Sequence, residues 1–157
     1  MKTDKHFFAN VSNYAGWLRT SHTARHLAIF ELFKQTLELP GSIAEFGVWR
    51  GSSFFLLARL LDIFDVSKQE TMGLSSRHLF GFDTFQGFVD IHDNDKNLSS
   101  HKEKKIGGLS FDINTFETCL NHMKEELRYP ENIHIIKGDV RDTWPKFIEQ
   151  NSGVKFN

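Results

Sequence analysis

Hydrophobic positions in the first third of the chain predict a helix followed by a short buried strand. Residues 20–38 place four large apolar side chains roughly on one helical face. These side chains are Leu27, Phe30, Leu32 and Phe33. Ser21 or Thr23 is expected to be the N-cap of this helix. The run "SIAEFGV" at 42–48 then has the length and apolar character of a buried strand.

The middle of the chain predicts a second helix, a second strand and a long connection. Residues 52–66 are apolar nearly all round, as expected of a helix between a sheet and another layer. Residues 67–77 are polar and predict a loop, and "HLFGFDTF" at 78–85 predicts a strand with an acid near its end. Residues 86–111 have weak periodicity and many charges, which predicts a long mobile loop.

The last third predicts one more helix, strand and helix. Asn114 followed by Glu117 three residues later is a capping-box pattern that opens a helix. "NIHIIKGDV" at 132–140 predicts a third strand. Residues 142–150 predict a final helix with Pro145 in its first turn.

This alternation of helices and strands indicates an α/β fold with a parallel sheet and helices on both faces. Residues 1–157 are expected to form a single domain, with 1–19 as an N-terminal arm. The sequence ends shortly after Gly153, where a fourth strand is expected to begin. The strand at 42–48 is therefore expected to have an uncovered edge.

Composition narrows the classes of function. A net charge of −1 provides no basic field for nucleic acid or an anionic membrane surface. Cys119 is the single cysteine, which excludes an internal disulfide and fits a reducing, cytoplasmic location. The longest apolar stretch, residues 54–61, is too short to span a bilayer and contains Arg59.

Acidic residues stand at or near the carboxyl ends of all three predicted strands. They are Glu45, Asp83 and Asp139. Ligands of open parallel sheets bind beyond these strand ends, and carboxylates suit a ligand that is cationic or rich in hydrogen-bond donors. Gly47 and Gly51 permit a tight turn after the first strand.

The loop after the first strand favours a small ligand over a diphosphate. Neither G-x-G-x-x-G nor G-x-x-x-x-G-K-[ST] is present, and Trp49 occupies the place where a middle glycine would let a pyrophosphate approach. Ser52 and Ser53 start the following helix, whose free N–H groups attract a carboxylate. A zwitterion with an attached nucleoside fits these features, and S-adenosylmethionine is such a molecule.

Each part of S-adenosylmethionine has an expected partner. Glu45 or nearby carbonyls would accept from its ammonium group, Asp83 from its ribose diol, and Asp139 from its adenine amine. The residues expected to contact the cofactor are Glu45, Gly47, Val48, Trp49, Gly51, Ser52, Ser53, Asp83, Thr84, Asp139 and Val140.

Simpler roles stay open for several of these residues. The glycines can merely shape a turn, and Asp83 can cap a turn or helix. Asp142 lies close enough in sequence to exchange roles with Asp139. Trp49 lines the cofactor pocket or packs under the N-terminal helix. His22 and His26 lie four apart on a helix, where a solvated face is favoured over a zinc site.

Three segments resemble one family of enzymes. "EFGVWRGSS", "FGFDTFQGF" and "GDVRDTWP" are similar to motifs of the macrocin O-methyltransferase (TylF-like) family of class I methyltransferases. The resemblance runs from about residue 20 to 150. It implies a Rossmann-like sheet, S-adenosylmethionine as cofactor and methylation of a hydroxyl on a sugar or other small molecule, often with Mg²⁺.

The resemblance also implies that part of the family pattern is absent. The family's metal-binding and basic aspartates lie mainly on and after a fourth strand, so no catalytic base or metal ligand is assigned here. We therefore expect a Rossmann-like sheet truncated after about three strands, and a chain that is inactive alone. The alternatives are a non-catalytic binding or assembly module that forms homo-oligomers through its uncovered strand, and an NAD-dependent enzyme that modifies nucleotide sugars.

Overall fold

The computed structural model describes residues 13–72, 77–93 and 105–156, with the backbone alone for 65–72. Three parallel strands form the sheet in the order β1-β2-β3. They are β1 (Ile43–Phe46), β2 (Leu79–Asp83) and β3 (Ile133–Lys137). Glu45 pairs with Gly81, and Asp83 with Lys137. The predicted α/β fold with a parallel sheet is confirmed.

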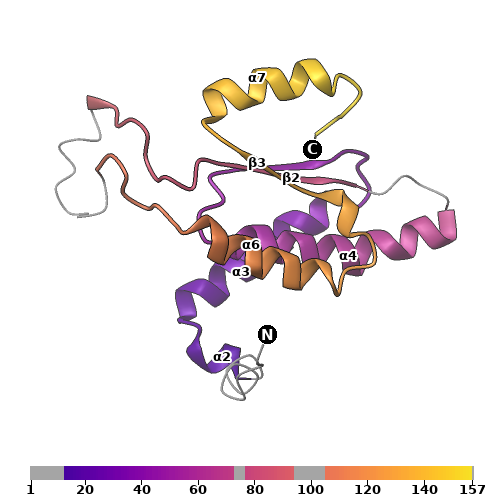
Figure 1. Cartoon of the computed structure of the whole chain (residues 1–157). Coiled ribbons are helices and arrows are strands. Elements are labelled where there is room, and N and C mark those ends of the chain that lie inside the picture. Colours follow the sequence, from indigo (N-terminus) through magenta and orange to yellow (C-terminus); the bar gives the residue numbers. More distant parts are fainter. Residues whose placement is uncertain (1–12, 73–76, 94–104, 157) are drawn as a thin grey trace.

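Helices cover both faces of this sheet (Figure 1). On one face lie α3 (Thr20–Gln35), α4 (Ser52–Met72) and α6 (Ile113–Lys124), and on the other lies α7 (Val140–Gln150). The short helix α2 (Tyr14–Trp17) precedes α3, and the 3-10 turn η1 (Pro130–Asn132) precedes β3.

Alternation along β2 separates two hydrophobic clusters, one on each face. Leu79 packs with Phe54 of α4 and Phe116 of α6, whereas Phe80 and Phe82 pack with residues of α7. Gly81 is needed because a Cβ there would lie 2.7 Å from the Phe54 ring. The sheet and α4 are therefore in close contact at Gly81, two residues before the carboxyl end of β2.

Some details of the first two predicted helices were wrong. Helix α3 begins at Thr20, with Arg19 at the N-cap position, so neither Ser21 nor Thr23 caps it. Leu27 and Leu32 are 59% and 63% exposed, because the buried contacts of α3 are made by Phe33 and, partly, Phe30.

The predicted loop at 67–77 is helical through Met72, since no glycine or proline interrupts the sequence before Gly73.

The first residues of helices α6 and α7 also differ from prediction. Asp112 caps α6, because its carboxylate accepts the Thr115 N–H at 2.9 Å, and the Asn114–Glu117 capping box does not form. Asp139 caps α7, which starts the helix at Val140. Pro145 therefore lies inside the helix, where it removes one helical hydrogen bond, and not in the first turn.

The described ends of the long connection 86–111 run alongside each other. The Phe88 N–H donates to the Gly108 carbonyl at 3.0 Å, and the Gly107 N–H donates to the Phe88 carbonyl at 2.8 Å. Residues 94–104 lie outside the described part, so the mobility of this connection stays a prediction.

The chain returns to the free side of β1 at its last described residues. Ser42 and Phe156 form a parallel bridge, in which the Ser42 N–H donates to the Lys155 carbonyl at 2.7 Å. Among the described strands, none pairs with the outer edge of β1 from Ile43 to Phe46. The residues after Gly153 thus lie at the position expected of a fourth strand.

Candidate functional site

Backbone hydrogen bonds bring the carboxyl ends of the three strands together. The Gly47 N–H donates to the Phe82 carbonyl, and the Gly138 N–H donates to the Asp83 carbonyl, both at 2.9 Å. Glu45, Asp83 and Asp139 consequently lie along one edge of the sheet. Glu45 and Asp83 are close enough for their charges to interact, and Asp139 follows the end of the adjacent strand.

The loop after β1 contains three residues in the left-handed backbone region. Their φ angles are 88° at Gly47, 51° at Trp49 and 83° at Gly51. A Cβ on Gly51 would lie 2.6 Å from the Phe55 ring and 2.9 Å from the Phe116 ring, whereas a Cβ on Gly47 would meet nothing within 4 Å. Gly51 therefore allows α4 to pack closely, and Gly47 faces open space at the sheet edge.

Asp83 holds this loop in place. Its Oδ2 accepts the Trp49 N–H at 2.7 Å, and its Oδ1 accepts the Phe85 N–H at 2.6 Å. Both donors belong to non-glycine residues with positive φ, so one carboxylate stabilises two strained turns. Thr84 continues the second turn by donating to the Gly87 carbonyl.

Glu45 is a partly buried carboxylate at this edge. Its Oε1 accepts a 2.5 Å hydrogen bond from the Ser53 hydroxyl, while no donor in the described residues reaches its buried Oε2. Burial raises the pKa of Glu45; the Ser53 hydrogen bond opposes that rise, and the nearby Asp83 adds to it. A buried acceptor without a donor is costly and marks this position as a candidate ligand contact.

Asp139 serves first as a structural cap. Its carboxylate accepts the Arg141 backbone N–H at 2.9 Å and pairs with the Arg141 guanidinium at 2.6 Å. These interactions with Arg141 lower the pKa of Asp139. The Asp142 N–H donates to the Asp139 carbonyl, so Asp142 lies in the first turn of α7. Asp139, and not Asp142, therefore follows the end of β3.

The remaining predicted residues differ in what they offer to a ligand. Val48 is buried in the core, so its side chain does not face the edge. Trp49 is 36% exposed, and its ring lies under the Arg50 guanidinium, 4.6 Å from the carbon of that group. Val140, the first residue of α7, is also partly exposed.

Sequence reasoning missed one neighbour of this edge. The Nε2 atom of His26 lies 3.1 Å from the Ser52 hydroxyl at the start of α4. The expectation of a solvated face for His22 and His26 did not include this contact, which depends on the packing of α3 against α4. Among the described residues, no group of three or more His, Cys, Asp or Glu side chains could hold a metal ion.

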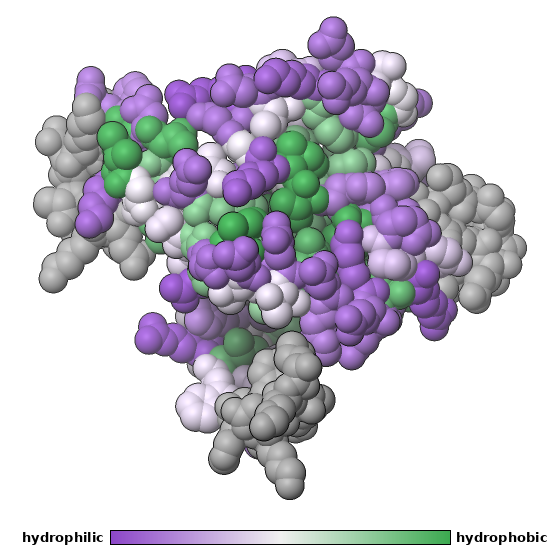
Figure 2. All heavy atoms as spheres, in the orientation of Figure 1, coloured by the Kyte–Doolittle hydropathy of each residue, from purple (hydrophilic) through white to green (hydrophobic). Residues whose placement is uncertain are grey.

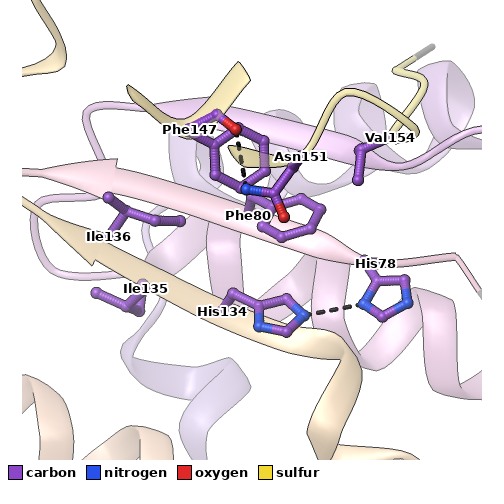
Figure 3. Close-up of a pocket in the computed structure, with 8 residues that line it drawn as sticks. All are labelled: His78, Phe80, His134, Ile135, Ile136, Phe147, Asn151 and Val154. Atoms are coloured by element: carbon purple, nitrogen blue, oxygen red, sulfur yellow. Dashed lines mark hydrogen bonds between the residues drawn. The ribbon is translucent and has the colours of Figure 1, made fainter. Parts of the chain in front are cut away.

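A hollow lies near the opposite end of the strands, between the sheet and the end of α7 (Figure 3). Its volume is about 380 Å³. It is lined by His78, Phe80, His134, Ile135, Ile136, Phe147, Asn151 and Val154. His78 Nδ1 and His134 Nε2 are 2.9 Å apart, so one ring donates to the other. Burial and the charges of His78 and Lys124 lower the pKa of His134.

Comparisons with known proteins agree with the fold. The sequence profile of the macrocin-O-methyltransferase (TylF) family matches residues 25–154. Demethyldecarbamoylnovobiocin O-methyltransferase from Streptomyces niveus is 25% identical over 139 residues, which are 82% of this chain and 48% of that protein.

Solved methyltransferases have the same fold. The structure of CalS11, a calicheamicin methyltransferase, has a TM-score of 0.77 and 25% identity, with 92% of this chain and 55% of that chain covered. The apo structure of CalS11, there described as a TDP-rhamnose 3′-O-methyltransferase, has a TM-score of 0.68 and 22% identity, with 98% and 56% covered. The O-methyltransferase NovP has a TM-score of 0.55 and 22% identity, with 75% and 46% covered.

The chain spans about half the length of these relatives. No helix among the described residues is long and apolar enough to cross a membrane.

Because the family profile covers residues 25–154, this chain belongs to the macrocin O-methyltransferase (TylF) family.

Proposed function

We propose that this chain forms the S-adenosylmethionine-binding half of an enzyme that methylates a hydroxyl group on a sugar or another small molecule. The observation that carries the proposal is the meeting of Glu45 and Asp83 beside the glycine loop, in a chain of this family. CalS11, described as a TDP-rhamnose 3′-O-methyltransferase, supports a sugar hydroxyl as acceptor.

The edge residues fit the groups of the cofactor. Glu45 has a buried oxygen that no described donor reaches, and it would interact with the cationic amino acid part. Asp83 has further lone pairs beside those used by Trp49 and Phe85, and it would accept from the ribose diol. Asp139 would accept from adenine only by sharing a carboxylate that already binds Arg141.

The cofactor would supply an electrophilic methyl group, and the residues described here would bind and orient it. Methyl transfer to an oxygen depends mainly on bringing the two reactants into line. The Asp83 contacts fix the loop geometry before binding, which lowers the ordering cost of recognition. No catalytic base or Mg²⁺ ligand is proposed among these residues.

Apolar side chains of the 86–111 connection are proposed to contact the acceptor. Phe88, Val89, Ile106 and Leu109 are all at least partly exposed. Phe88 follows β2 by five residues, and its backbone is tied to that of Gly107 and Gly108. Figure 2 shows that green hydrophobic atoms also reach the surface between α7 and the helices of the other face.

Calorimetric titration of the complete protein with S-adenosylmethionine tests this function. We expect micromolar binding, and roughly a ten- to hundredfold loss in Asp83→Asn, because hydrogen bonds to charged groups contribute about 1.5–3 kcal/mol. Asp83→Ala should lose most of the binding, since it releases both the Trp49 and Phe85 turns, whereas the Asn amide oxygen can still accept one of these N–H groups.

The matched control is Glu131→Gln, an exposed carboxylate in η1 at the other end of β3. It should bind like the unchanged protein. Absence of any S-adenosylmethionine binding would end the proposal, and retention of NAD in its place would favour the dinucleotide alternative.

A further inference from the structure

Glu45 has an asymmetric environment that ligand binding can change. Ser53 of α4 donates to Oε1 at 2.5 Å, but Oε2 is buried and receives no hydrogen bond from the described residues. A carboxylate oxygen in this position pays a desolvation cost that a neutral carboxyl group largely avoids. The geometry before the cofactor binds therefore favours a proton on Glu45.

Among the charged groups near Glu45, one carboxylate acts in the same direction as burial. Asp83, from β2, is the neighbouring carboxylate, and its repulsion adds to the effect of burial on the pKa of Glu45. Arg50 in the loop stacks over Trp49 and Phe111, and His26 from α3 contacts Ser52. Within the described ranges, no lysine, arginine or histidine forms an ion pair with Glu45.

We propose that Glu45 carries a proton in the free protein and releases it when the cationic cofactor binds. This inference rests on the proposed function, because S-adenosylmethionine supplies the positive charge. The O–H bond of the Glu45 carboxyl group breaks, its electron pair stays on the oxygen, and the proton passes to solvent. The resulting carboxylate is then stabilised by the ammonium and sulfonium charges.

Ser53 has a positioning role in this exchange. Its hydroxyl donates to Oε1 and stabilises the ionised form of Glu45, so it sets the pH at which the proton leaves. The same bond fixes the carboxyl group on the α4 side. Ser53 thus acts through Glu45, and the sequence-based expectation of a direct contact between Ser53 and the cofactor is not needed.

Calorimetry in buffers of different ionisation enthalpy measures the exchanged proton directly. For the complete protein titrated with S-adenosylmethionine between about pH 5 and pH 8, we expect a net release that approaches one proton per bound cofactor in the acidic range. The release should vanish at alkaline pH, where Glu45 is already ionised. A binding heat that is independent of buffer at every pH would overturn the inference.

Three variants assign the proton to this pair of residues. Glu45→Gln should bind with no buffer-dependent heat in the acidic range, where the α-amino group of the cofactor is already protonated. Ser53→Ala should move the release to higher pH, because the hydrogen bond that lowers the Glu45 pKa is lost, and Ser53→Thr should restore the original profile. A merely structural role of Ser53 would change affinity without moving this profile.

The control is Thr118→Ala on the exposed side of α6, which should leave the profile unchanged. Buffer-dependent heat that persists in Glu45→Gln in the acidic range would overturn the assignment to Glu45. Absence of any cofactor binding would instead contradict the proposed function, whereas binding without proton exchange would contradict this inference alone.

Discussion

Single residues of the β1–α4 loop show how local and distant contacts combine. Gly47 and Gly51 adopt positive φ without a steric cost, as expected from the sequence. Trp49 has a φ of 51°, which costs energy for a residue with a Cβ. Asp83, 34 residues later, offsets this cost by binding the Trp49 N–H. The glycines were predictable, but the Trp49 conformation depends on a contact that only the fold creates.

Gly51→Ala is expected to destabilise the protein strongly. A left-handed conformation costs about 1–3 kcal/mol for a non-glycine residue, and overpacking against Phe55 and Phe116 adds a further ~1–3 kcal/mol. Urea unfolding measures the loss. Gly153→Ala, where a Cβ would meet nothing within 4 Å and φ is not left-handed, is the control and should be close to neutral. Equal stability of the two variants would contradict the packing argument.

At the scale of elements, hydrophobic periodicity predicted each strand and all but the shortest helices. Strands β1, β2 and β3 lie inside the predicted ranges, and apolar side chains pack on both faces of the sheet that they form. Helix ends were less predictable. Asp112 and Asp139 cap helices at positions where other start residues were expected, since several polar residues near each start could serve and the fold selects one.

The contact between His78, just before β2, and His134 of β3 makes the free energy of unfolding depend on pH. The pKa of His134 is lowered from 6.5 in the folded protein, so the unfolded chain binds more protons once the pH falls below that value. The free energy of unfolding should therefore be steady above about pH 6.5 and decrease below it. Protonation of both rings would also break the 2.9 Å bond between His78 and His134.

Urea unfolding at several pH values tests this dependence. His134→Gln should show a weaker loss of stability between neutral and mildly acidic pH, because the titrating ring is gone. His122→Gln, an exposed histidine on α6, is the control and should retain the full dependence. An unchanged pH slope in His134→Gln would show that other groups cause the loss.

At the scale of the whole molecule, the sheet order β1-β2-β3 puts β1 at a boundary. Phe156 reaches this side of β1 only at Ser42, and Phe46 at the far end is 52% exposed although it stacks on Phe82. An unpaired edge with an exposed aromatic residue is a template for pairing with another chain.

We expect the 157-residue chain to self-associate through the β1 edge. Size-exclusion chromatography with light scattering should show a mass that rises with protein concentration. Phe46→Lys should reduce the rise, because a charge on the edge opposes strand pairing. Ile63→Lys, an exposed apolar position on α4, is the control and should leave the mass unchanged. A constant monomeric mass in every variant would contradict association at this edge.

The sequence by itself determined the order of helices and strands, the parallel α/β class and the three acidic strand ends. These features follow from periodicity and turn residues, which act between near neighbours in the chain. Only the tertiary structure decided what the acids do. Asp83 binds Trp49, Glu45 binds Ser53 and Asp139 binds Arg141. The first two contacts join strand ends to the β1–α4 region through packing geometry, and hydrogen bonding depends on distances that residue spacing alone does not set.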